Sequence, residues 1–257
     1  MSRLQLPSSR YNSYALVHKG LRAFMMHTLN KTGTADWQDG DDCANVLATV
    51  RSLAETCRSH LQHENDFIHT AMEARRPGSA RHGQLDHHEH EQAISGLLAD
   101  CDRIERSHAG ERSRLGAMLY DRLALFIAEN LEHMAMEEVD HNAVLWAHYS
   151  DAEIIAIEHA LVASIAPEKA MHFLRWMLTA ATPAERADKL RGMRAQMPPE
   201  VFLGVLAMLQ PLLSATDWHK LQLALELSTP FADCDPAELD AFSNQRRTFV
   251  PPQKAVA

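Results

Sequence analysis

Residues 112–148 read RSRLGAMLYDRLALFIAENLEHMAMEEVDHNAVLWAH. Apolar residues recur in it every three or four positions, as at Leu119, Leu123 and Phe126. That spacing is typical of one face of an α-helix, whereas a half-buried strand would alternate apolar and polar residues. The stretch therefore predicts one long amphipathic helix whose apolar face packs against a core.

The same helical spacing extends through almost the whole chain, and no segment alternates convincingly like a strand. The first 150 residues contain four predicted helices, separated by short turn-forming segments. The helices are 9–30, 42–74, 86–107 and 112–148, and the turns are Lys31-Thr32-Gly33, Arg76-Pro77-Gly78-Ser79 and Ala109-Gly110. Four helices with short connections pack most readily as an antiparallel bundle. We expect an all-α fold with an up-and-down four-helix bundle over residues 1–149.

Shorter helices are predicted after the bundle, each opened by a recognisable cap. Ser150–Glu153 and Thr182–Glu185 both have the pattern of a capping box. Prolines mark further helix starts, at Pro167, Pro198-Pro199 and Asp235-Pro236. We expect a helical C-terminal extension over residues 150–242 and a loosely ordered tail over 243–257.

Composition and charge exclude several classes of protein. The 257 residues are 46% hydrophobic and 23% charged, which is typical of a globular chain. A formal net charge of -9 gives no general attraction for nucleic acid or an anionic membrane, so neither is expected as a partner. No apolar run approaches the roughly 20 residues that span a bilayer, and the N-terminus lacks the apolar segment of a signal peptide. Four widely spaced cysteines without a CxxC pair favour a reduced, cytoplasmic location.

Histidine is unusually frequent, and thirteen of the sixteen histidines precede residue 150. Several fall on the apolar stripes of the predicted helices. His60 and Glu64 lie on the stripe of the second helix, and His133 and Glu137 on that of the fourth. Residues four apart share one helix face, so each pair can reach a common ion. His18 lies on the first helix, and a histidine-rich run opens the third.

These buried polar residues need a common partner, because an unpaired polar group on an apolar face costs on the order of a few kcal/mol. A divalent metal supplies that partner. Imidazole and carboxylate without thiolate indicate iron, manganese or zinc. Five histidines and two carboxylates exceed what one tetrahedral zinc requires, and they suit two six-coordinate ions bridged by Glu64 and Glu137. The candidate metal ligands are His18, His60, Glu64, His87, His90, His133 and Glu137.

Each part of this pattern has a plainer interpretation as well. An isolated HxxxE on a helix is more often a surface hydrogen-bonded pair. The run Asp86–Glu91 can be solvated surface, so the choice among its ligand candidates His87, His88, His90 and Glu91 stays open. His63 and His69 are expected to project away from the site, and His141 is a possible outer group. Surface or packing roles are expected for His27, His82, His108, His159, His172 and His219.

Three segments resemble the hemerythrin-like, or HHE cation-binding, family: Tyr14-Ala-Leu-Val-His18, His60-Leu-Gln-His-Glu64 and His133-Met-Ala-Met-Glu137. The resemblance covers residues 11–148. It implies an up-and-down bundle around a non-haem di-iron centre, with His18, His60, His133 and the third-helix histidines as terminal ligands and two bridging glutamates. Oxygen carriers of this family tend to have third-helix histidines four residues apart, whereas His87 and His90 are three apart.

The fourth helix departs from those carriers too, because they usually have an aspartate five residues after the histidine. Glu138 holds that place here, and Glu137 resembles the iron-sensing and HHE branches. The bridge could therefore be Glu137 or Glu138. Both departures argue against simple reversible oxygen carriage.

The sequence favours a di-iron protein that binds or senses oxygen, nitric oxide or iron. The alternative is a di-iron enzyme, such as a ferroxidase, a peroxidase-like enzyme or an iron-centre repair protein. A helical scaffold with an incidental histidine cluster is a third hypothesis. No catalytic residue is assigned, since the chain has no GxSxG elbow, phosphate-binding loop or HExxH motif. No protein partner is assigned either.

Overall fold

The computed structural model describes residues 10–227, and all regular structure in that range is helical. The all-α prediction is therefore confirmed for this part of the chain. In the first 181 residues the elements are α1 (Ala15–Gly33), α2 (Gly40–His63), the π-helix η1 (Glu64–His69), α3 (Thr70–Arg75), α4 (Arg81–Glu105), α5 (Ala109–His148), α6 (Asp151–Ser164) and α7 (Pro167–Ala180). They are followed by α8 (Pro183–Gln196), α9 (Pro199–Leu209), the short 3-10 helix η2 (Gln210–Leu212) and α10 (Ala215–Ala224).

Helical structure occurs where all four long helices were predicted, with different ends, and the helix predicted over 42–74 consists of α2, η1 and α3 in succession. The largest shift is at the first helix, which begins at Ala15 instead of residue 9. Asn12 explains the later start, because its side-chain oxygen accepts hydrogen bonds from the backbone N–H groups of Tyr14 and Ala15. An asparagine in that role satisfies the donors that open a helix and so fixes where it begins.

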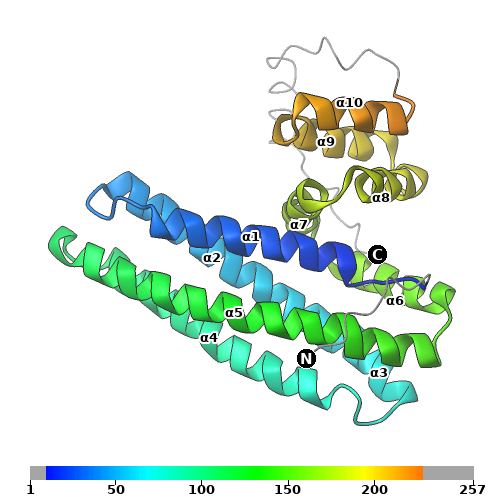
Figure 1. The fold of residues 1–257 in the computed structure, drawn as a ribbon, viewed down its shortest axis with the longest axis horizontal. Coiled ribbons are helices and arrows are strands. Elements are labelled where there is room, and N and C mark those ends of the chain that lie inside the picture. The colour runs from blue at the N-terminus through cyan, green and yellow to red at the C-terminus, as the bar shows by residue number, and fades with distance from the viewer. Residues whose placement is uncertain (1–9, 228–257) are drawn as a thin grey trace, which may run out of the picture. The chain divides into compact units, whose positions relative to one another are not determined.

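The long helices α1, α2, α4 and α5 lie side by side and enclose one apolar core (Figure 1). Each of them contacts two of the others: α1 contacts α2 and α5, and α4 contacts the same two. Phe24, Leu53, Leu97 and Phe126 lie in this core and are at most 2% exposed. Burying a side chain of that size stabilises a fold by about 1.5–3 kcal/mol. The core fixes the helix faces that carry the histidines and glutamates.

Helix α7 packs along α1 within the same compact unit, which runs to Ala181. The rings of Phe24 and Trp176 stack with centroids 4.4 Å apart. The helices approach so closely at Gly20 that a Cβ atom there would lie 2.9 Å from the backbone nitrogen of Met177. Glycine at this position is therefore what lets α7 lie against α1.

The second compact unit begins at Thr182, and its described part runs to residue 227. Its core includes Leu190, Leu209 and Trp218. The capping boxes predicted at Ser150 and Thr182 are both confirmed. The predicted start at Asp235-Pro236 and the tail over 243–257 lie outside the described residues, and the boundary at 149/150 stays a prediction.

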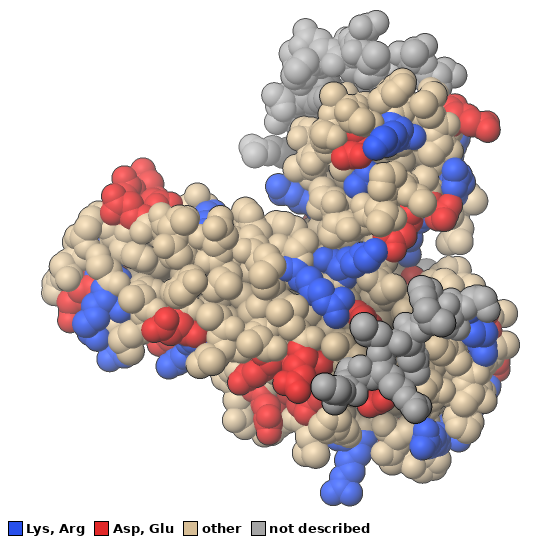
Figure 2. All heavy atoms as spheres, in the orientation of Figure 1, with Lys and Arg blue, Asp and Glu red and all other residues tan. Residues whose placement is uncertain are grey.

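Charged side chains of both signs are scattered in small groups over the face drawn in Figure 2, and most of that face is uncharged. None of the helices between residues 10 and 227 combines the length and the apolarity needed to cross a membrane.

Candidate metal centre

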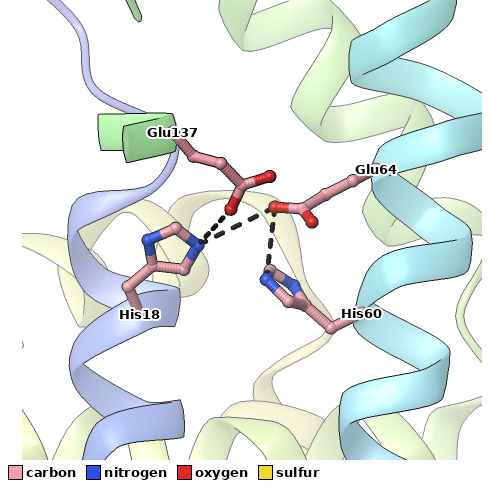
Figure 3. A group of neighbouring side chains, drawn as sticks. All are labelled: His18, His60, Glu64 and Glu137. Carbon is pink, nitrogen blue, oxygen red and sulfur yellow. Dashed lines mark ion pairs between the residues drawn. The ribbon is translucent and has the colours of Figure 1, made fainter. Parts of the chain in front are cut away.

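His18, His60, Glu64 and Glu137 converge inside the first compact unit (Figure 3). They come from α1, from the α2–η1 segment and from α5, and one ligand atom of each lies within 4.8 Å of the others. The Nε2 atom of His60 is 3.2 Å from Oε1 of Glu64. Nε2 of His18 is 3.7 Å from the same oxygen and 3.5 Å from Oε2 of Glu137. We call these four residues the first group.

A second group consists of Glu64, His87, His133 and Glu137, and all four are buried. Nε2 of His87 is 3.5 Å from a carboxylate oxygen of each glutamate. Nε2 of His133 lies 3.2 Å from Oε1 of Glu137 and 3.1 Å from Nε2 of His87. Each group thus brings two imidazoles to the same two carboxylates.

The two glutamates divide their oxygen atoms between the groups. Glu64 presents Oε1 to His18 and His60 and Oε2 to His87. Glu137 presents Oε2 to His18 and Oε1 to His87 and His133. Each carboxylate thus directs one oxygen towards each group, which is the geometry of a bridging carboxylate. Each group could hold a metal ion, and the two groups share both carboxylates.

Many of these ligand atoms have no hydrogen-bond partner among the described residues. They are Nε2 of His18, Nε2 of His60 and all four carboxylate oxygens of Glu64 and Glu137. A buried carboxylate without partners costs several kcal/mol or more. Such a convergence of unpaired lone pairs fits a divalent cation better than it fits a packed core.

The outer nitrogen of three of these histidines is held by a polar side chain. Nδ1 of His18 is 3.0 Å from Glu138, Nδ1 of His133 is 3.1 Å from Asp86, and Nδ1 of His87 is 2.9 Å from Asn65. An acceptor at Nδ1 places the proton there and leaves the Nε2 lone pair directed at the glutamates. Metal-binding histidines are oriented in this way in most proteins.

The electrostatics of the cluster reflect two carboxylates facing each other away from water. Burial and the charge of Glu137 raise the pKa of Glu64 above its usual range. Burial alone would raise the pKa of Glu137 as well, but the imidazoles of His133 and His87, which lie 3.2 and 3.5 Å from its Oε1, lower it well below that range. Burial lowers the pKa of His133, yet the adjacent carboxylate of Glu137 raises it to about 9. Without a cation, these surroundings favour protonation of Glu64, His18 and His133.

The histidine-rich run contributes one residue to the two groups, His87. His90 is buried beside His133, with ring centroids 4.8 Å apart, but it belongs to neither group. His88 is exposed and bonds to Gln92. Glu91 pairs with Arg58. His90 as a ligand therefore stays a prediction without support from this geometry.

Glu137 and Glu138 have different surroundings, which bears on the open choice of bridge. Glu137 is fully buried and faces both groups. Glu138 bonds to Nδ1 of His18 and to Arg22 instead. Glu137 therefore belongs to both groups, whereas Glu138 orients His18 through its Nδ1 atom.

The prediction that His69 projects away from the site was wrong. His69 is fully buried and forms a third group with Glu137 and His141. Five residues of α-helix would turn His69 well away from Glu64. In the π-helix η1, hydrogen bonds join residues five apart, so both side chains face the site. Nothing in the apolar spacing signals a π-helix, and only the high local histidine content hinted at a further donor.

His141, predicted as a possible outer group, lies in that third group as well. The histidines assigned to surface or packing roles occur in none of the three groups found between residues 10 and 227. His27 and His172, for example, lie against the rings of Trp176 and Phe24.

Comparison of the chain with family models, with curated proteins and with solved structures finds no match.

Proposed function

We propose that this chain is a non-haem di-iron protein that binds or senses a small diatomic ligand, oxygen or nitric oxide, or iron itself. The observation that carries the proposal is the sharing of Glu64 and Glu137 between two pairs of buried histidines. Histidine and carboxylate donors without thiolate suit iron, with manganese or zinc as possible substitutes.

The arrangement of the helices supports a hemerythrin-like, up-and-down four-helix bundle as the scaffold. Successive long helices α1, α2, α4 and α5 run in opposite directions (Figure 1), and each contacts two of the others. The donors come from all four, as expected for a metal site built in a bundle core from facing helices.

The residues leave room for an added ligand. In the proposed arrangement His18 and His60 bind one iron, His87 and His133 bind the other, and both glutamates bridge. Each iron then has four protein donors, fewer than a six-coordinate ion accepts. The bound pair would supply the redox change and the open coordination positions that oxygen or nitric oxide requires.

Substitution of the ligands tests this proposal. We expect His60→Ala and Glu64→Gln each to abolish tight binding of two irons per chain, because each removes a donor from a buried site. Elemental analysis and the near-ultraviolet spectrum of the purified protein measure the loss. His27→Ala is the control and should keep its iron, since His27 contacts Trp176 and lies in none of the groups. Two irons retained after either ligand substitution would refute the assignment.

A further inference from the structure

His69 and His141 lie beside the two groups without being part of either. Both are at most 2% exposed, and their ring centroids are 5.0 Å apart in an edge-on arrangement. Together with Glu137 they bring ligand atoms within 4.8 Å of one another. Asn65 and Tyr14 form hydrogen bonds with the two rings, and the ring of His87 stacks on that of His69.

The hydrogen bonds of His69 direct a lone pair into this space. Its Nδ1 atom is 3.0 Å from Oδ1 of Asn65, which can only accept a hydrogen bond. The proton of His69 is therefore on Nδ1, and Nε2 carries the lone pair. That Nε2 is fully buried and has no hydrogen-bond partner among residues 10–227. An imidazole lone pair buried without a donor is costly, and a cation would satisfy it.

His141 lies close to Oε1 of Glu137, the oxygen that also faces His87 and His133 in the second group. Its Nδ1 is 3.7 Å from Oε1 of Glu137 and 3.0 Å from the hydroxyl of Tyr14. Helix α4 makes room for both imidazoles at Gly83. A Cβ atom there would lie 2.9 Å from Cε1 of His141 and 3.1 Å from Nε2 of His69.

We infer that His69, His141 and Glu137 form a third position for a divalent cation, beside the pair proposed above. Two imidazoles and one carboxylate form a donor set that suits ferrous iron and leaves open coordination positions. The inference rests on the proposed function, because Glu137 is also a ligand of the proposed iron pair. With only three protein donors, the third position binds its cation more weakly than the pair does.

Titration of the full chain with Fe2+ in the absence of oxygen tests this. Starting from metal-free protein, calorimetry should resolve two tight equivalents followed by a third, weaker one. His69→Leu and His141→Leu should each lose the third equivalent and keep the tight two. His88→Leu is the matched control, because His88 is an exposed histidine on α4. This variant should keep the third equivalent of Fe2+, and loss of that equivalent would mean that the weak step is adventitious binding to surface histidines.

Gly83→Ala tests the same position without removing a donor. The new methyl group collides with both imidazoles, so the third step should weaken or vanish while the tight steps stay. Circular dichroism of every variant confirms that the helices are intact, and if either leucine variant fails to fold, the Gly83→Ala titration decides.

The inference would be overturned if the wild-type chain bound only two equivalents of Fe2+. It would also be overturned if a third equivalent still bound after either leucine substitution. Loss of a tight equivalent in His69→Leu would also overturn it, by making His69 a ligand of the pair. The absence of any tight step in the wild-type chain is a different result, because it contradicts the proposed iron pair itself.

Discussion

A single amide oxygen sets the direction of two imidazoles. Oδ1 of Asn65 is 3.0 Å from Nδ1 of His69 and 2.9 Å from Nδ1 of His87, and the two rings stack with centroids 4.8 Å apart. Since an amide oxygen accepts two hydrogen bonds, Asn65 fixes both tautomers at once. Each Nε2 atom thereby keeps a lone pair that a cation can accept.

We therefore expect Asn65→Leu to weaken metal binding although Asn65 is not itself a ligand. Two buried N–H groups would lose their acceptor, at a cost of about 1–3 kcal/mol each. Loss of such an outer partner typically lowers metal affinity by about 10- to 100-fold. Competition against a chelator of known affinity measures the change. Asn45→Leu is the control, because Asn45 is exposed and its side chain accepts a hydrogen bond from Lys31, far from the metal ligands in the chain. Equal affinities in the two variants would contradict the role given to Asn65.

The identity of the converging residues could be predicted from the sequence more accurately than the hydrogen bonds and the backbone geometry that orient them. The i, i+4 pairs at His60 and His133 identified both glutamates, because an α-helix places such residues on one face. Asn65 carried no signal of its own. His69 was misplaced, since its direction depends on local backbone geometry that residue types do not encode.

At the scale of the elements, apolar spacing predicted the long helices because their buried faces repeat every three or four residues over many turns. It could not predict the π-helix η1, which inserts a wider turn into an otherwise continuous helical pattern. Such single-turn insertions occur frequently at functional sites. Nor could it predict that α7 packs on α1, since an amphipathic helix can cover any apolar face of suitable size.

The packing of α7 on α1 depends on the missing side chain at Gly20. We expect Gly20→Ala to destabilise the fold by about 1–3 kcal/mol, because the added Cβ meets the backbone of Met177. A collision with backbone cannot be relieved by a rotamer change. Urea unfolding followed by circular dichroism measures the difference.

Gly110→Ala is the matched control, because Gly110 also lies in a helix and an added Cβ would meet nothing within 4 Å. There we expect no loss of stability and a gain of up to about 1 kcal/mol from helix propensity. A Gly20→Ala protein as stable as the control would mean that α7 is not held closely against α1.

At the scale of the whole molecule, the division after Ala181 predicts where the chain can be shortened. A fragment of residues 1–181 should fold and bind the same number of irons as the full chain. A fragment of residues 1–149 lacks α7 and exposes the face of α1 that carries Phe24. We expect the 1–149 fragment to have a lower thermal midpoint than the 1–181 fragment, because it loses the free energy of burying the apolar side chains between α1 and α7. Equal midpoints for the two fragments would contradict this.

The sharing of Glu64 and Glu137 has a mechanical consequence. The proposed donors span the chain from His18 to Glu137. A bound pair of metal ions would therefore cross-link the chain and close loops of up to about 120 residues. Withdrawing the metal would then release segments that lie far apart in the chain and leave two facing carboxylates to be neutralised by protons alone. Unfolding of the loaded protein should accordingly be a single steep transition, and the stripped protein should melt earlier and over a wider range.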